Sequence, residues 1–214
     1  MPEYHLSGWE PNNPRFAEIA AEAHKYQSAY QDLAKELKIN ICAGTIVQTA
    51  PTPASNGVAS TAPTDDDGKP VLLNISPFIS YTGELLGTYT KTNIWIPERE
   101  HLTSSVQFAQ SSAQAKPSSG QHERHQRDLE HAGVAHSEPP GTAVHEVIQT
   151  PLGNIGILIC WDLAFPEAFR SLIRQECKLI LLPTYWTAFD MSEEGRRINK
   201  DGEKLFLESM LVAR

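Results

Sequence analysis

Apolar and polar residues alternate along the chain with two different periods, which predict helices and strands. Between Phe16 and Leu37 apolar side chains recur at three- and four-residue steps, so we expect one long amphipathic helix. Shorter apolar runs predict strands over residues 39–47, 71–80, 85–90, 143–150, 155–159 and 178–183. Further helices are expected after Pro166 and over residues 204–214, the latter with Leu205, Phe206, Ser209, Met210 and Val212 as inner residues. Buried strands that alternate with amphipathic helices predict an α/β fold.

The strand over residues 155–159 is apolar on both faces and stops abruptly at Cys160. Pro166 then opens a helix, so Cys160 is expected on a short turn at the carboxyl end of a buried strand. Open α/β sheets place their chemistry at strand ends of this kind. A free cysteine is as often a small buried hydrophobic residue, so position alone leaves both interpretations open.

The sequence around this cysteine resembles the nucleophile segment of the nitrilase (carbon–nitrogen hydrolase) superfamily. The matching residues are Cys160-Trp161-Asp162, followed by Phe165-Pro166-Glu167 and an amphipathic helix. That family uses a Glu–Lys–Cys triad, and two upstream segments resemble its other members in the same order. Pro2-Glu3-Tyr4 resembles the segment of the general base, and Tyr89–Trp95 resembles the segment of the lysine.

The resemblance implies that Glu3, Lys91 and Cys160 are the catalytic residues. In isolation Lys91 would be interpreted as a solvated strand end and Glu3 as a surface carboxylate; the ordered trio favours the enzyme family. The implied fold is an α-β-β-α four-layer sandwich in which residues 1–214 form one partial domain. Because the family has strands before the general base and after the last helix, we expect this sandwich to be incomplete at both termini and the chain alone to be marginally stable, aggregation-prone and inactive.

Two further residues receive roles from the resemblance, and two more from their position after a strand. Glu98 is expected to be the family's second, supporting glutamate, with Glu100 as the alternative. The backbone N–H of Trp161 is expected to stabilise negative charge on the substrate together with the lysine. Tyr185 and Trp186 follow the strand over residues 178–183 and are candidate substrate contacts; a packed loop is the alternative.

The implied reaction is hydrolysis of a non-peptide C–N bond in an amide, carbamoyl compound or nitrile, through a thioester and without a cofactor. Trp161-Asp162 stands where true nitrilases usually have Trp-Glu, which favours an amide or carbamoyl substrate. A neighbouring lysine favours the thiolate, so we expect a depressed pKa at Cys160 and faster labelling than at Cys42 or Cys177, both interpreted as structural.

Composition excludes several classes of function. The chain has 214 residues, a net charge of -8 and no basic run, which argues against a nucleic-acid partner. No apolar stretch approaches the roughly 20 residues needed to span a bilayer, so no membrane partner is expected. Three widely spaced cysteines and no recognisable signal peptide indicate a reducing compartment, most simply the cytoplasm. The resemblance further implies a small-molecule substrate and a homo-oligomer in the full-length form.

A low-complexity insert is expected at about residues 103–142. It is rich in Ser, Gln, Ala, Pro and Gly and carries His122, His125, His131 and His136. We interpret it as flexible and solvated; a metal site is the weaker alternative, because two further ligands at fixed spacing are missing. Substitution of His122 or His125 by alanine is therefore expected to leave the protein unaffected.

A second function class stays open beside the thiol hydrolase. The chain could be a catalytically inactive relative that keeps the fold as a binding or scaffold domain. The reactivity of Cys160 toward a thiol reagent, measured against the two other cysteines, discriminates between the two.

Overall fold

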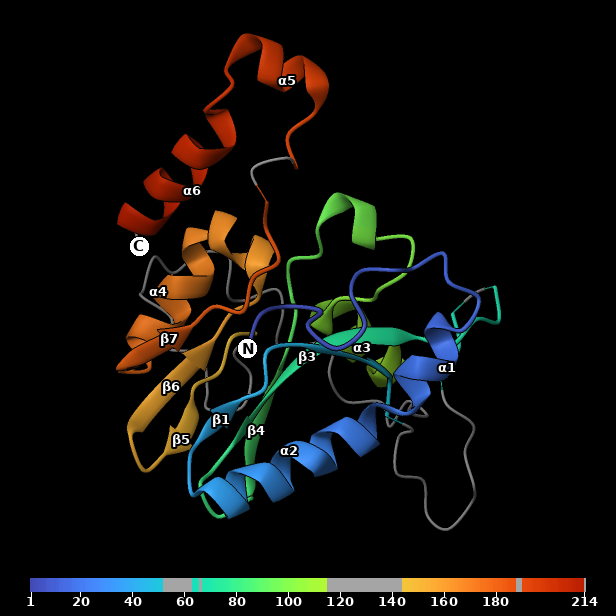
Figure 1. The fold of residues 1–214 in the computed structure, drawn as a ribbon, viewed down its shortest axis with the longest axis vertical. Coiled ribbons are helices and arrows are strands. Elements are labelled where there is room, and N and C mark those ends of the chain that lie inside the picture. The colour runs from blue at the N-terminus through green and yellow to red at the C-terminus, as the bar shows by residue number, and fades with distance from the viewer. Residues whose placement is uncertain (52–62, 66, 115–143, 188–189, 214) are drawn as a thin grey trace, which may run out of the picture.

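The computed structural model describes residues 1–51, 63–65, 67–114, 144–187 and 190–213, and these fold around two β-sheets (Figure 1). The first sheet contains β1 (Ile41–Cys42), β2 (Ile46–Thr49), β3 (Leu72–Ile79) and β4 (Leu85–Thr90). The second contains β5 (Ile148–Thr150), β6 (Gly153–Ile157) and β7 (Leu179–Leu181). Among the described residues no helix is both long and apolar enough to cross a membrane.

In the first sheet β3 is the central strand and is buried along its whole length. It pairs antiparallel with β4 on one side, in the predicted hairpin, and with β1 and β2 in succession on the other. The predicted strand over residues 39–47 is therefore interrupted. The break falls at Gly44, whose φ of +68° lies in the left-handed region that favours glycine.

In the second sheet β6 is central, antiparallel to β5 and parallel to β7. The pairing of β6 and β7 continues past the strand ends, since Leu158 N donates to Leu181 O and Cys160 N donates to Pro183 O, each at 3.0 Å. The chain crosses from β6 to β7 through η2 (Cys160–Ala164) and α4 (Pro166–Arg174). The prediction that the strand around Leu179 is buried is wrong, because β7 is an edge strand here and Leu179 is 47% exposed.

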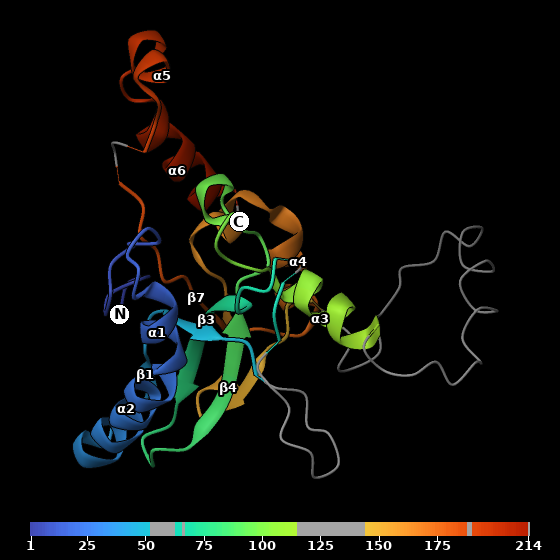
Figure 2. The ribbon, with the colours of Figure 1, turned by 90° about the vertical axis from the view of Figure 1, so that its right-hand side faces the viewer.

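Helices cover the outer face of each sheet (Figure 2). On the first sheet lie α1 (Phe16–Ala21) and α2 (Ala23–Leu37), which divide the predicted single helix at Glu22. On the second sheet lies α4, whose Ala168, Phe169 and Leu172 join the largest apolar cluster with strand residues of both sheets. The two sheets approach closely, since a Cβ on Gly87 of β4 would lie only 2.8 Å from Ile148 of β5. The predicted helix–sheet–sheet–helix sandwich is therefore confirmed.

Two stretches differ from the sequence-based expectation. Residues 105–114, the first part of the expected flexible insert, form helix α3 (Ser105–Gln114), and Phe108 packs against the apolar cluster under α2. The four histidines of the insert lie outside the described residues. Before α3, a single 3-10 turn, η1 (Ile96–Glu98), follows the exit of β4.

The carboxyl-terminal part forms α5 (Glu193–Ile198) and α6 (Gly202–Val212), which extend away from the sheets (Figure 1). The predicted inner face of the last helix is wrong for three of its five residues. Leu205 is 50% exposed, Val212 is 89% exposed and Ser209 is exposed too, whereas Phe206, Leu207 and Met210 face the rest of the protein. The observed inner face of α6 differs from the predicted one because α6 packs against η2 and Trp186.

Candidate active site

The structure brings Glu3, Lys91 and Cys160 together from three separate parts of the chain. Glu3 belongs to the N-terminal segment, Lys91 directly follows β4, and Cys160 opens η2 at the carboxyl end of β6. All three are buried, with 2%, 0% and 8% of their surfaces exposed. Glu3 and Lys91 both act on the pKa of the Cys160 thiol, so the three side chains form one electrostatic unit.

The N-terminal segment is fixed against the interruption between β1 and β2. Tyr4 N donates to Thr45 Oγ1 at 3.0 Å, and Thr45 N donates to Pro2 O at 3.3 Å. A Cβ on Gly44 would lie 2.2 Å from Pro2 O, so only glycine allows the segment to lie this close. The same break that interrupts the strand therefore places Glu3 in the site.

Lys91 is held between two carboxylates in the protein interior. Its Nζ donates to Glu3 Oε1 and to Glu98 Oε1, each at 2.8 Å. Glu98 also accepts from Trp95 N at 2.9 Å and from the hydroxyl of Tyr4. Glu98 thus takes the position expected of the supporting glutamate, whereas the alternative, Glu100, is exposed on the surface.

Both oxygens of Glu3 have further partners. Asn74 Nδ2 of β3 donates to Oε1 at 3.0 Å, and Tyr185 N donates to Oε2 at 3.1 Å. Tyr185 also accepts a hydrogen bond from the Cys160 thiol through its backbone O, with Sγ and O 3.9 Å apart. The backbone of Tyr185 therefore links Glu3 to Cys160. The ring of Tyr185 takes no part in this link, and the residue is 55% exposed.

The buried charges shift three pKa values. Burial raises the pKa of Glu3; Lys91 opposes this rise, and Glu98 adds to it. Burial disfavours the charged form of Lys91, but the two carboxylates outweigh it and raise the pKa of the ammonium. Burial and then Glu3 raise the pKa of Cys160, and Lys91 compensates only in part. The expected depressed pKa of Cys160 is therefore wrong: the resting thiol is protonated beside an acceptor, Glu3.

The backbone at Cys160 is held in an unusual conformation. Its φ of +46° lies in the left-handed region, which costs a residue with a Cβ on the order of 1 kcal/mol or more. Cys160 N donates to Pro183 O and Asp162 N donates to Ile159 O, each at 3.0 Å, so the backbone on both sides of Trp161 is fixed. The expected interaction of the Trp161 N–H with a substrate oxygen stays a prediction.

Asp162 connects the cysteine turn to the lysine loop. Its buried carboxylate accepts from Ile159 N at 2.8 Å and from Tyr89 OH at 2.9 Å, and also from the N and Nδ2 of Asn93 at 2.9 and 2.8 Å. The chain on either side of Lys91 is thus tied to the chain on either side of Cys160. We attribute the alignment of the two residues to this carboxylate.

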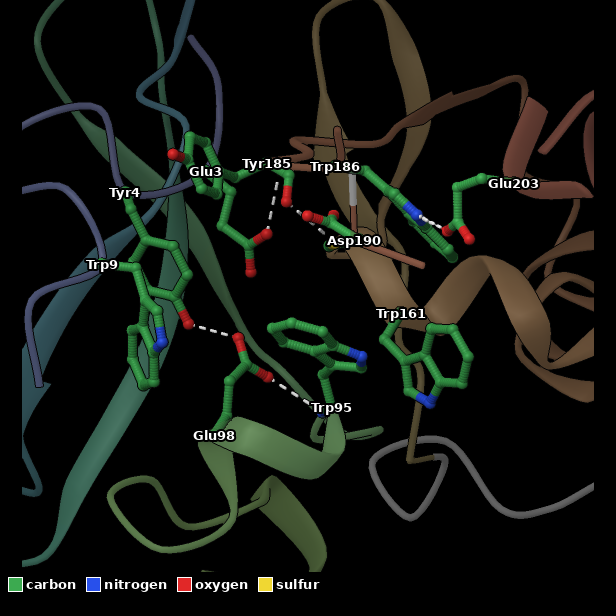
Figure 3. Close-up of a pocket in the computed structure, with 11 residues that line it drawn as sticks. Glu3, Tyr4, Trp9, Trp95, Glu98, Trp161, Tyr185, Trp186, Asp190 and Glu203 are labelled. Carbon is green, nitrogen blue, oxygen red and sulfur yellow. Dashed lines mark hydrogen bonds between the residues drawn. The ribbon is translucent and has the colours of Figure 1, made fainter. Parts of the chain in front are cut away.

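A cavity of about 360 Å³ opens beside the triad. Glu3 and Glu98 point into it from opposite sides (Figure 3). Tyr4 and Trp9 lie on one side of the view and Trp161 and Trp186 on the other, and the ring of Trp95 lies between them. Trp161, Trp186 and Phe206 of α6 pack together with ring centroids 5.4 to 6.2 Å apart. Tyr185 and Trp186 line the cavity, and their role as substrate contacts stays a prediction.

The sequence reasoning missed several residues of the site: Tyr4, Trp9, Asn74, Asn93, Trp95, Asp162, Asp190 and Glu203. For Asn74 a signal was present, because a lone amide inside the apolar run 71–79 needs a buried hydrogen-bond partner. For Glu203 no local pattern distinguishes it from the other acids of a charged helix. Among the described residues no group of three His, Cys, Asp or Glu side chains is placed to hold a metal ion.

Comparison with known proteins identifies the family and several relatives. A family model described as carbon-nitrogen hydrolase matches residues 1–200. The chain is 22% identical over 188 residues to a Schizosaccharomyces pombe protein named "Probable nitrilase C965.09", covering 87% of the chain and 49% of that protein. It is 42% identical over 45 residues to N-carbamoylputrescine amidase of Arabidopsis thaliana, which is 21% of the chain and 15% of the amidase.

Solved structures show the fold. The carbon-nitrogen hydrolase of Helicobacter pylori G27 superposes with a TM-score of 0.52 at 16% identity, covering 92% of the chain and 51% of its own. Nit3 of Saccharomyces cerevisiae superposes with a TM-score of 0.53 at 18% identity, covering 87% and 50%. The chain therefore spans about half the length of these proteins and of the first curated relative.

Proposed function

Because the chain belongs to the carbon–nitrogen hydrolase family, we propose that it hydrolyses non-peptide C–N bonds with Cys160 as nucleophile, Glu3 as general base and Lys91 as the cation that stabilises the transition state. One observation carries the proposal. A single buried ammonium contacts two buried carboxylates beside a buried thiol, at the wall of a cavity. Burial of three ionised groups is costly, and clusters of perturbed groups in a cavity are typical of active sites.

The reaction begins with a neutral thiol. As Sγ attacks the carbonyl carbon, the thiol proton passes to Glu3, and the carbonyl π electrons move to the oxygen. Lys91 Nζ and the N–H of Trp161 are the donors for this oxygen; loss of one such donor typically lowers the rate about 100- to 1000-fold. Collapse of the tetrahedral adduct expels the amine, which leaves with the proton from Glu3 as ammonia or a larger amine.

The thioester is hydrolysed by the same groups. Glu3, now unprotonated, accepts a proton from water as the water oxygen attacks the thioester carbon. The adduct collapses to the carboxylic acid, and the proton returns to the sulfur. Glu98 binds no substrate in this scheme; it holds Lys91 in place. We propose an amide or carbamoyl substrate rather than a nitrile, following the Trp161-Asp162 sequence.

Release of ammonia from small amides tests the proposal. The wild type, Cys160→Ala and the control Cys177→Ala, each in a full-length form, are incubated with a panel of aliphatic amides, carbamoyl amines and nitriles. We expect turnover by the wild type and the control and none by Cys160→Ala. Intact mass spectrometry of the wild type during turnover is expected to show an acyl adduct that Cys160→Ala lacks.

The same assay separates the hydrolase from the binding-domain alternative. An unaltered turnover in Cys160→Ala would refute the nucleophile assignment. Amide binding by the wild type without ammonia release or an acyl adduct would instead support a non-catalytic relative. A homo-oligomeric full-length form and a cytoplasmic location stay predictions.

A further inference from the structure

All four tryptophans of the chain line the cavity beside the triad: Trp9, Trp95, Trp161 and Trp186. They come from four separate segments, so the fold gathers them there rather than the local sequence. Figure 3 shows their rings on both sides of the space between Glu3 and Glu98. Large aromatic walls suit an apolar chain, and they suit a cation equally well, because a ring face attracts positive charge.

The charged groups of the wall decide between these two ligands. Four carboxylates line the cavity, those of Glu3, Glu98, Asp190 and Glu203, and no Lys, Arg or His does so among the described residues. The buried ammonium of Lys91 contacts two of these carboxylates, those of Glu3 and Glu98. The potential inside the cavity is therefore negative, which attracts a cationic ligand and repels an anionic one.

Two of these carboxylates are held in place away from the triad. Glu203 accepts from the indole N–H of Trp186, whose ring packs 5.4 Å from Trp161. Asp190 accepts from the N and Oγ1 of Thr187, at 2.9 and 2.8 Å. Each acid is oriented by its neighbours, so little side-chain entropy is lost when a ligand is bound.

We propose that the substrate carries a positive charge, an alkylammonium or a guanidinium group, at the end remote from its scissile amide. This rests on the proposed function of the triad. The amide lies against Cys160, the chain of the substrate lies between the indole rings, and the cationic end faces Glu203 and Asp190. A neutral chain of the same shape gains the ring contacts but not the charge interaction.

Tryptophan fluorescence tests the proposal by binding alone, because every tryptophan of the chain reports on this cavity. The full chain with Cys160→Ala, which is not expected to consume the ligand, is titrated with three amides of nearly equal size. These are 4-aminobutanamide, pentanamide and succinamate, which are cationic, neutral and anionic. We expect the cation to bind about tenfold more tightly than pentanamide, and succinamate to bind weakest. Equal or tighter binding of pentanamide or succinamate, or no binding of any, overturns the proposal.

Two further measurements locate the charge. The preference for the cation over pentanamide is expected to shrink as NaCl is raised from 20 to 500 mM, because salt screens charges that solvent reaches. It is also expected to fall at least fivefold in Asp190→Asn/Glu203→Gln, but not in Glu208→Gln, which removes an exposed carboxylate from the same helix α6. A preference unaffected by both salt and the double substitution would refute a role for these acids.

The outcomes separate this inference from the proposed function. Ammonia release with pentanamide preferred over 4-aminobutanamide would leave the hydrolase standing and remove the cation specificity. Tight binding of the cation without ammonia release would support the cation specificity and contradict the hydrolase proposal.

Discussion

Replacement of Lys91 by methionine is the sharpest test of how the site is built. Methionine has nearly the same length and fills the same space, so the change removes only the charge. Lys91 is fully buried and contacts Glu3 and Glu98 at 2.8 Å each, and its loss leaves two carboxylates facing one another without a cation. Removal of one partner of a buried ion pair typically costs about 3 to 5 kcal/mol of the free energy of unfolding.

The destabilisation by Lys91→Met is limited by the free energy needed to protonate one of the two carboxylates. A carboxyl group whose ordinary pKa is 4.5 takes up a proton at pH 7 for about 3 kcal/mol, since each pH unit corresponds to about 1.4 kcal/mol. In Lys91→Met one of the two carboxylates is therefore expected to be protonated in the folded state. A raised carboxyl pKa means that the folded state binds more protons than the unfolded state above pH 4.5, so stability is lost as pH rises.

Urea unfolding at pH 5 and pH 7, followed by tryptophan fluorescence, measures the effect. Relative to wild type, we expect Lys91→Met to be destabilised by about 3 kcal/mol at pH 7, the cost of protonating one carboxylate, and by about 2 to 3 kcal/mol less at pH 5. The control is Lys25→Met, which removes an ammonium 2.6 Å from Glu22 on the surface and is expected to leave the urea midpoint close to that of wild type. Equal effects of the two substitutions, or no dependence on pH, would show that the Lys91 cluster is not buried.

Three further outcomes follow from the structure. Iodoacetamide is expected to label Cys177 faster than Cys160 at pH 7.5, because burial and Glu3 raise the pKa of Cys160; peptide mapping checks it, and preferential labelling of Cys160 would contradict it. Glu3→Gln removes a charge that raises this pKa, so we expect faster alkylation of Cys160 together with loss of turnover; slower alkylation would argue against it. Gly156→Ala would place a Cβ 2.5 Å from Leu172 of α4, and we expect it to lower the free energy of unfolding by about 1 to 3 kcal/mol; an unchanged urea midpoint would mean that α4 adjusts freely.

The parts of the fold encoded in short stretches were predictable from the sequence. The hairpin of β3 and β4 agrees with its predicted boundaries to within one residue, because an apolar run, a turn and a second run are adjacent along the chain. The positions of Glu3, Lys91 and Cys160 came from family motifs, and the structure brings these residues together. Composition and periodicity would have supplied only Cys160, as a cysteine at a strand end.

The remaining features depend on residues distant in sequence. The break at Gly44 is required by the N-terminal segment that crosses it, which no pattern within residues 39–47 reveals. The inner face of α6 is set by Trp161 and Trp186, so helical periodicity alone placed Leu205 wrongly. The pKa of Cys160 depends on how many charges are buried around it, and a lysine in the motif indicates only one of them.

The number of charges in the site also indicates how the thiol proton moves in the proposed reaction. Glu3, Glu98 and Lys91 already leave the cluster with an excess of negative charge, so ionisation of Cys160 to solvent would add another negative charge in a buried place. Transfer of the thiol proton to Glu3 leaves the total charge unchanged and is therefore less costly. In the proposed reaction, the attack of the sulfur on the substrate and the transfer of the thiol proton to Glu3 therefore occur in one step. Lys91 can then interact with the new oxyanion, because Glu3 becomes neutral. A cationic substrate would offset the remaining excess of negative charge. The negative charge that favours binding of such a substrate is thus the same charge that keeps the thiol of Cys160 protonated before the reaction.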